Sequence, residues 1–294
     1  MSDSRVSAPD RIRRSILFCP GSRPERFAKA LASGADSVCL DLEDGVAPDA
    51  RDAAREAVIA FLSNDGVRGD SDPERMVRIN AVRNEDGRRD LEALRALGPT
   101  RVPLAVMVPK VDGPDDLEDV ARVLGDMPAL LPLIETARGL QRVQEIADSG
   151  RARGGLIFGG MDLAAEIGCR FEWEPLLYAR SRIVHAAALA GLGTIDAAWA
   201  PLDDAAGLRA ETVRAARLGF TGKLAIHPAQ VPIIHDGLAP DVDELEAARR
   251  IVEAANRASG GVLVVDGRMV DRPVVLGARR VLARAGDAGA SRAT

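Results

Sequence analysis

Eight short apolar segments alternate with helix-forming segments along most of the chain, and this alternation limits the possible folds more than any other feature. The apolar segments are residues 15–19, 37–40, 76–80, 105–110, 130–134, 156–158, 194–196 and 223–227. Helical crossovers between successive strands predict a parallel sheet. Eight such units in series predict an α/β fold of the TIM (β/α)8 barrel type. A doubly wound sheet is the alternative, but no glycine-rich nucleotide-binding motif follows the first apolar segment.

The chain continues beyond the predicted barrel. We expect the barrel at residues 14–238, a small C-terminal helical lid at 239–286, a flexible N-terminal arm at 1–13 and a flexible tail at 287–294. The lid segment has too little apolar surface to form a core of its own. We therefore expect it to pack on a barrel mouth, either of its own chain or of a neighbouring subunit.

The composition excludes several classes of function. The 294 residues carry a net charge of −5 with both signs interspersed, which argues against a nucleic-acid-binding surface. No apolar run is long enough to span a membrane, and the N-terminus lacks the apolar core of a signal peptide. The three cysteines, Cys19, Cys39 and Cys169, are odd in number and predict reduced packing residues in a cytoplasmic protein.

Charged residues follow most of the apolar segments. They are Asp41, Glu43, Asp44, Arg78, Lys110, Glu135, Asp162, Asp196 and His227. The carboxyl ends of parallel strands meet at one mouth of a barrel, where α/β enzymes place their active sites. A charge at a partly desolvated mouth is costly unless it is paired, so packing alone does not explain this many charges. We expect the acids, opposed by Arg78, to hold a cation and an anionic ligand together.

Glu135 and Asp162 are the leading candidates for metal ligands, because Mg²⁺ prefers carboxylate oxygens and waters. The alternative is that each acid caps the helix that follows it, since acids are favoured at helix N-termini. Position alone gives the two interpretations equal weight, and the other charged strand ends favour the metal site.

Three further residues at the predicted mouth allow more than one interpretation. Arg78 can donate to a carboxylate or a thioester carbonyl, or it can pair with Glu43 or Asp44. Lys110 can form a Schiff base in an aldolase, but a salt bridge is favoured beside a metal site. His227 can act as a general base, or it can be a hydrogen-bonded structural residue before Pro228.

These residues lie in motifs whose combined order resembles the citrate lyase β-subunit-like branch of the HpcH/HpaI aldolase/citrate lyase superfamily. The motifs are FCPGSRPERFAKA, LDLEDGV, VRIN, PK, LIETARGL, GGMDLAAEIG, AIHPAQV and MVDRPV, and they span nearly the whole chain. Each motif alone is a weak signal, whereas their order is specific. One departure is the segment APDAR after LDLEDGV, where that branch commonly carries a lysine-bearing segment; we expect this difference to affect only the second helix.

The resemblance implies a TIM barrel that binds Mg²⁺, with Mn²⁺ as a substitute. Glu135 and Asp162 correspond to the metal ligands, and Glu43 and Asp44 to acids that support the metal's waters. Arg78 corresponds to an arginine that contacts the oxygens of the substrate.

The resemblance also implies binding sites for a coenzyme A (CoA) thioester and a small 2-keto acid. Pro20, Gly21, Arg23 and Lys29 correspond to the region that holds the CoA phosphates. The backbone N–H groups around Gly160 and Met161 correspond to those that hold the keto-acid carboxylate, as helix N-termini commonly do. Proteins of this branch are usually homotrimers or hexamers of trimers.

Asp271 occurs in the segment Met269-Val270-Asp271-Arg272-Pro273. In the free-standing acyl-CoA lyases that this chain resembles, the corresponding aspartate lies on the lid and reaches a neighbour's active site. The resemblance therefore implies that Asp271 is the catalytic base. The alternative is that Asp271 caps the last helix of the chain.

The predicted activity is that of a Mg²⁺-dependent carbon–carbon lyase. It would cleave a β-hydroxyacyl-CoA of the malyl-CoA or citramalyl-CoA type to a 2-keto acid and an acyl-CoA by retro-Claisen chemistry. One alternative is a citrate lyase β subunit that works with partner subunits. A second is a CoA-free class II pyruvate aldolase, although no histidine lies near Cys19 or Arg23 to serve as that branch's base. A third is a non-catalytic CoA-binding protein, which would not need a base such as Asp271.

Overall fold

The predicted strands form a closed barrel in the computed structural model, which describes residues 11, 13–64, 72–98, 105–126, 128–258 and 262–290. The strands are β1 (Ser15–Pro20), β2 (Ser37–Asp41), β3 (Glu74–Arg78), β4 (Ala105–Val108), β5 (Ala129–Ile134), β6 (Leu156–Phe158), β7 (Thr194–Asp196) and β8 (Gly222–Ala225). Each strand pairs in parallel with the next, and β8 closes the ring by pairing with β1. The TIM-barrel fold class is confirmed.

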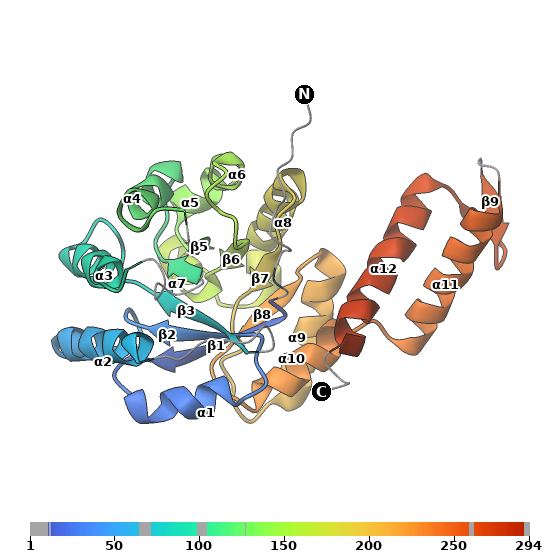
Figure 1. Cartoon of the computed structure of the whole chain (residues 1–294). Coiled ribbons are helices and arrows are strands. Elements are labelled where there is room, and N and C mark those ends of the chain that lie inside the picture. Colours follow the sequence, from blue (N-terminus) through green and yellow to red (C-terminus); the bar gives the residue numbers. More distant parts are fainter. Residues whose placement is uncertain are drawn as a thin grey trace. The chain divides into compact units, whose positions relative to one another are not determined.

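Helices follow the strands of the barrel and surround the ring of strands (Figure 1). They are α1 (Phe27–Leu31), α2 (Arg51–Ser63), α3 (Glu85–Ala96), α4 (Pro114–Leu124), α5 (Ala137–Gln141), α6 (Val143–Asp148), α7 (Gly160–Ile167), α8 (Trp173–Ala190), α9 (Ala205–Leu218) and α10 (Gln230–Leu238). Two short 3₁₀ helices, η1 (Pro24–Arg26) and η2 (Pro48–Ala50), precede α1 and α2. None of the helices within the described residues combines the length and the apolar character that a membrane crossing requires.

The barrel interior is a packed apolar core to which all eight strands contribute. The buried residues of this cluster are Ile16, Cys39, Met76, Ala105, Met107, Leu131, Leu133, Ile157, Ile195 and Leu224. Side chains alternate between the two faces of a strand, so the residue two positions after an interior residue also points inward. Asp41, Arg78 and Glu135 stand two positions after Cys39, Met76 and Leu133, which places them on the interior face at the carboxyl ends of β2, β3 and β5.

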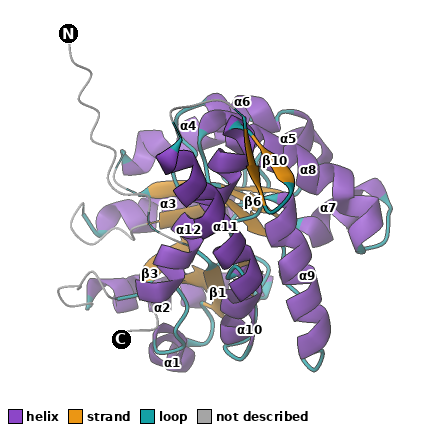
Figure 2. Cartoon of the chain, turned by 90° about the vertical axis from the view of Figure 1, so that its right-hand side faces the viewer, coloured by secondary structure: helices purple, strands orange, loops and turns teal. Residues whose placement is uncertain are grey.

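The chain divides into two compact units after Ile234, within α10; the sequence analysis placed the end of the barrel at residue 238, at the end of the same helix. The second unit contains α11 (Val242–Arg257), β9 (Leu263–Val265), β10 (Arg268–Val270) and α12 (Arg272–Ala290). The antiparallel β9–β10 pair joins α11 and α12, which run side by side (Figures 1 and 2).

The described residues include small parts of the two predicted termini. Residues 287–290 belong to α12, so the helix continues beyond the end expected at 286, and residues 291–294 lie outside the described residues. Residues 1–10 and 12 of the predicted arm also lie outside them. Arg13 is ordered, because its guanidinium makes two hydrogen bonds of 2.7 Å to the buried carboxylate of Glu74.

Asp196 does not face the barrel mouth, contrary to the expectation that it belongs to the group of acids there. Its neighbour Ile195 is an interior residue, so Asp196 points outward between the strands and the helices. There Asp196 accepts hydrogen bonds from Arg180 Nε at 2.9 Å and Lys223 Nζ at 2.7 Å, and Lys223 also contacts Glu211 at 2.7 Å. This buried group of charges stabilises the contact of β7 and β8 with α8 and α9.

Replacing Lys223 by Met is expected to lower the free energy of unfolding by roughly 3–5 kcal/mol, because Asp196 then keeps only one of its two cations, Arg180, and Glu211 loses its closest one. Urea denaturation followed by circular dichroism measures the change. Lys29→Met is the matched control: Lys29 is exposed, so the same substitution should change stability by less than about 0.5 kcal/mol. Equal stability of the two variants would contradict a structural role for the buried group.

Candidate active site

Arg78 and Asp41 form the centre of the polar group at the carboxyl ends of the strands. The parallel register places Asp41 of β2 directly beside Arg78 of β3. Arg78 Nε and Nη2 donate to the two carboxylate oxygens of Asp41 at 2.6 and 2.7 Å. Arg78 Nη1 lies 2.8 Å from Glu43 and 3.6 Å from Asp44, and the guanidinium stacks 4.7 Å from the ring centre of Phe18. The arginine is therefore held in one position by ion pairs and by the ring.

The Asp41 carboxylate also shapes the loop that carries Glu43. It accepts hydrogen bonds from the backbone N–H groups of Glu43 at 3.0 Å and Gly45 at 2.9 Å. A Cβ atom at Gly45 would lie 2.3 Å from Asp41 Oδ2, so only glycine allows this approach. Asp41 thus fixes both Arg78 and Glu43, whereas the sequence analysis named it as a strand-end acid and gave it no role of its own.

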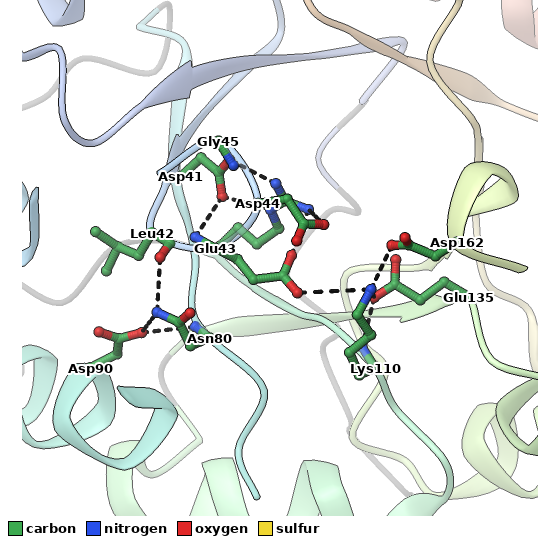
Figure 3. A network of polar contacts seen from close by, with 11 residues as sticks. Asp41, Leu42, Glu43, Asp44, Gly45, Asn80, Asp90, Lys110, Glu135 and Asp162 are labelled. Atoms are coloured by element: carbon green, nitrogen blue, oxygen red, sulfur yellow. Dashed lines mark hydrogen bonds and ion pairs between the residues drawn. The ribbon is translucent and has the colours of Figure 1, made fainter. Parts of the chain in front are cut away.

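A second group of contacts converges on the ammonium of Lys110 (Figure 3). Its Nζ lies 2.5 Å from Asp162 Oδ2, 3.5 Å from Glu135 Oε1 and 4.0 Å from Glu43 Oε1. These acids follow three different strands, β2, β5 and β6, and meet at one cation. The salt-bridge interpretation of Lys110 is confirmed.

The backbone at Lys110 is unusual, because its φ of +52° is rare for a residue with a side chain. This conformation aims the Lys110 N–H at Glu135, with a distance of 2.8 Å from N to Oε1. Strained backbone of this kind persists where the surroundings enforce it, commonly at functional sites. Glu135 is further enclosed by Gly159, where a Cβ atom would lie 2.6 Å from Glu135 Oε2.

Burial changes the pKa values of the acids in this group. Burial raises the pKa of Glu135 to about 9 although Lys110 opposes the shift, and burial raises the pKa of Glu43 to about 7 against the effect of Arg78. Burial is the largest effect on the pKa of Asp162 and acts to raise it, but the hydrogen bonds with Lys110 and Glu135 and the positive charges of Lys110 and Arg78 together lower it below its ordinary value. Two buried carboxyl groups therefore hold protons more tightly than usual, which is the environment that a bound cation would relieve.

The acids around Lys110 are suitable for binding a divalent cation. Glu43 Oε2 is buried and accepts no hydrogen bond within the described part of the chain, although Arg78 Nη1 lies 2.8 Å away. Among the described residues, no set of three or more side chains forms a complete metal cage. Mg²⁺ does not require one, because it commonly binds one or two carboxylates and keeps several waters. Glu135 and Asp162 would supply the carboxylates, and Glu43 would face the waters.

A supporting layer that the sequence analysis did not identify lies behind these residues. Asn80 is buried and donates from Nδ2 to the carbonyl of Leu42 and to Asp90, both at 2.8 Å (Figure 3). Asp90 in turn accepts from Arg55 Nε at 2.6 Å. The layer links α2 and α3 to the loop that carries Glu43. Its only signal in the sequence is the polar Asn80 directly after a buried strand.

The residues predicted to bind CoA phosphates are placed by β1 and the segment after it. Pro20 is the last residue of β1 and lies beside Asp41 in the strand register. Gly21 donates its N–H to the Asp41 carbonyl at 2.7 Å, and a Cβ atom there would lie 2.8 Å from that carbonyl. Arg23 and Lys29 are exposed, and Arg23 lies 3.9 Å from Glu25. Pro20 and Gly21 are thus at the mouth, whereas within the described part of the chain no ion pair joins Arg23 or Lys29 to the acids around Lys110.

The remaining predicted residues follow β6 and β8 in the chain. Gly160 begins α7, and its Met161 neighbour has 54% of its surface exposed. The side chain of Asp162 is 41% exposed, so the group at Lys110 is open to solvent on this side. His227 Nδ1 accepts the N–H of Ala229 at 3.2 Å, which agrees with the structural interpretation of this histidine.

Asp271 belongs to the second unit, where it stands at the start of α12. Its carboxylate accepts the N–H of Val274 at 3.4 Å, and its carbonyl accepts the N–H of Val275 at 3.1 Å. The capping interpretation is therefore borne out within this unit. A cavity of about 350 Å³ adjoins Asp271 and is lined by apolar residues of α11, β9, β10 and α12 together with Arg272 and Arg279.

Comparisons with known proteins show what the whole chain is similar to. A family model described as HpcH/HpaI aldolase/citrate lyase matches residues 14–228. The chain is 38% identical over 288 residues to a (3S)-malyl-CoA thioesterase of Cereibacter sphaeroides, covering 96% of this chain and 97% of the relative. It is 39% identical over 285 residues to a citrate lyase subunit beta-like protein of Mycobacterium tuberculosis, covering 92% and 95%.

A solved structure with a similar fold is that of the CitE protein from Mycobacterium tuberculosis in complex with magnesium, acetoacetate and coenzyme A. The match has a TM-score of 0.81 at 35% sequence identity and covers 93% of this chain and 98% of that chain. The match extends beyond the 14–228 region of the family model.

Proposed function

The chain belongs to the HpcH/HpaI aldolase/citrate lyase family, and we propose that it is a Mg²⁺-dependent carbon–carbon lyase. Its substrate would be a β-hydroxyacyl-CoA of the malyl-CoA or citramalyl-CoA type, cleaved to a 2-keto acid and an acyl-CoA. Mn²⁺ would be able to substitute for Mg²⁺ in this reaction. The observation that carries the proposal is the convergence of Glu43, Glu135 and Asp162 on one cation, beside Arg78, at the mouth of the barrel. The CitE complex with magnesium and coenzyme A supports it.

The reaction assigns a task to each part of the site. Glu135 and Asp162 would hold Mg²⁺, which would supply a Lewis acid that makes the hydroxyl of the substrate more acidic. Asp271 would accept the hydroxyl proton. The carbon–carbon bond would then break, with its electron pair passing to the acyl-CoA as an enolate while the hydroxyl carbon becomes the keto group. A proton returned to the enolate completes the acyl-CoA.

Arg78 is suited to stabilise the enolate oxygen. Three of its five N–H groups face Asp41 and Glu43, which leaves two for a ligand. Because the ion pairs hold the guanidinium in place, it needs little reorganisation when negative charge develops. Glu43 and Asp44 would orient the waters of the metal.

The CoA and keto-acid sites are proposed on the same basis. Pro20, Gly21, Arg23 and Lys29 would hold the CoA phosphates, using the exposed cations after β1. The free N–H groups at the start of α7, from Gly160 and Met161, would hold the keto-acid carboxylate. Asp271 lies in the second unit and would reach the mouth in the assembled enzyme, a homotrimer or hexamer, from its own chain or from a neighbour.

A thioesterase is the second candidate, because a relative with 38% identity carries that name. Water would then attack the thioester carbonyl, and the products would be free CoA and the hydroxy diacid. The lyase reaction leaves the thioester intact and produces a 2-keto acid, so the two activities have different products.

Product analysis of purified full-length protein with Mg²⁺ tests the proposal. Malyl-CoA, methylmalyl-CoA and citramalyl-CoA would be supplied separately, and keto acid and free thiol measured in parallel. Keto acid without free thiol, lost on chelation of the metal, is the expected result. Free thiol without keto acid would establish the thioesterase instead, and absence of both would favour a citrate lyase β subunit or a CoA-free aldolase.

The binding of Mg²⁺ should release protons. Glu135, with a pKa of about 9, and Glu43, with a pKa of about 7, are partly or fully protonated near pH 7.5 before the metal binds. Because Mg²⁺ needs the carboxylate form, its affinity should fall as the pH is lowered, by about tenfold per pH unit for each proton released. Calorimetric titration at pH 7.5 in buffers of different ionisation enthalpy counts the protons. A binding enthalpy that is independent of the buffer would contradict the prediction.

A further inference from the structure

Lysine is rare in this chain, and its positions are informative. Only three of the 39 basic residues are lysines: Lys29, Lys110 and Lys223. Lys29 is exposed, whereas Lys110 and Lys223 each lie among several carboxylates. The ammonium of lysine is a compact point charge on a flexible stem, unlike the planar fork of arginine. Lysine therefore carries the charged group that most closely resembles a small cation, and the chain has lysine at both of these positions.

Lys223 and Lys110 differ in how tightly they are enclosed. The side chain of Lys223 is fully buried between β8 and α9. The side chain of Lys110 is 33% exposed, and its closest partner, Asp162, is 41% exposed. The ammonium of Lys110 can thus reach solvent without disrupting the packing, whereas that of Lys223 cannot.

The ammonium of Lys110 and a divalent cation would compete for the same oxygens. Lys110 Nζ lies 2.5 Å from Asp162 Oδ2 and 3.5 Å from Glu135 Oε1. A Mg²⁺ ion bound by these carboxylates would stand about 2.0–2.1 Å from their oxygens. Two positive charges cannot both stand between the two carboxylates at such distances.

We propose that Lys110 is a tethered counter-ion: its ammonium holds Glu43, Glu135 and Asp162 together when no divalent cation is bound, and it withdraws when a divalent cation binds. This inference rests on the proposed metal site. In this role Lys110 sets the affinity of the site for the metal, and it does not need to contact the substrate.

The backbone allows the side chain to leave while the site keeps its shape. The N–H of Lys110 donates to Glu135 Oε1 at 2.8 Å, and the left-handed conformation of the residue maintains this contact. The hydrogen bond does not involve the side chain. Withdrawal of the ammonium would therefore free the oxygens of Glu135 and Asp162 without releasing Glu135 from its position (Figure 3).

Calorimetric titration of Mg²⁺ into metal-free full-length protein gives the first test. Lys110→Met should bind Mg²⁺ at least about tenfold more tightly than the unmodified protein, because a competing unit charge 2.5 Å from Asp162 and 3.5 Å from Glu135 is removed. Lys110→Arg retains the charge and should not tighten binding. Arg122→Met removes a surface charge that is 72% exposed and should leave the affinity unchanged. Equal or weaker binding by Lys110→Met would overturn the proposal.

Nuclear magnetic resonance gives a second test, which observes Lys110 in the unmodified protein. Protein labelled with [ε-¹³C]lysine has three lysine signals, and the spectrum of Lys110→Met assigns the one from Lys110. Saturating Mg²⁺ should shift the Lys110 signal and leave that of Lys223 unchanged. Mg²⁺ binding measured by calorimetry with an unmoved Lys110 signal would overturn the counter-ion role alone. Absence of Mg²⁺ binding by both the unmodified protein and Lys110→Met would overturn the metal site itself and this inference with it.

Discussion

Replacing Glu135 by Gln is expected to abolish Mg²⁺ binding and to lower kcat/KM by at least about a thousandfold. Glu135 is buried at the carboxyl end of β5, and its oxygens face the cation position. Glutamine keeps the shape but removes the negative charge, so the site loses the several kcal/mol of electrostatic stabilisation that the metal supplies. Asp162→Asn should have a similar effect, since Asp162 is the second proposed ligand.

A matched control lies on the same helix as Asp162. Glu166 of α7 accepts a hydrogen bond from the N–H of Ala137 at 3.2 Å on an exposed part of the helix. Glu166→Gln should keep both Mg²⁺ binding and turnover. Titration calorimetry and the keto-acid assay measure the two quantities. Retention of normal Mg²⁺ affinity by Glu135→Gln and Asp162→Asn would show that the metal binds elsewhere.

Replacing Asp271 by Asn is expected to lower kcat by about 10²–10⁴-fold, which is the usual contribution of a general base. Asparagine caps helices as well as aspartate does, so the start of α12 should be preserved. The binding of Mg²⁺ and of a CoA thioester should also remain, because Asp271 is not proposed to contribute to either. The substitution therefore separates the capping role, which the structure shows, from the proposed role of base.

The second unit provides a matched control for this variant as well. Asp241 caps α11 and accepts the N–H of Glu244 at 2.7 Å. Asp241→Asn should leave turnover unchanged, because only the cap is involved. If Asp271→Asn retains the turnover of Asp241→Asn, Asp271 is a cap and the base must be another residue.

The barrel was predictable because its strands are buried on both faces. Such strands appear as continuous apolar runs, and their ends coincide with turns and charged residues. The prediction placed Arg78, Lys110 and Glu135 at one mouth for the same reason. It failed for Asp196 because β7 has three residues, too few to show which side chains face inward. A shift of one residue exchanges the two faces of a strand.

The sequence suggested the contact of Arg78 with Glu43 and a salt bridge of Lys110, but not the detailed geometry of the site. The bidentate contact of Arg78 with Asp41 depends on the register of β2 against β3, which a single sequence does not specify. The convergence on Lys110 depends on a left-handed backbone at a residue other than glycine. The role of Asn80 depends on the path of the loop at Leu42. Each of these features arises from tertiary contacts between segments far apart in the chain.

We propose that the acids around Lys110 form a divalent-cation site at which a 2-keto acid binds. Crystals grown with Mn²⁺ and pyruvate, measured at a wavelength where Mn²⁺ scatters anomalously, would locate both ligands. We predict one anomalous peak within bonding distance of Glu135 and Asp162, with pyruvate beside it and the ammonium of Lys110 displaced. An anomalous peak elsewhere, or an ammonium still in contact with Asp162 and no peak between the carboxylates, would contradict the account.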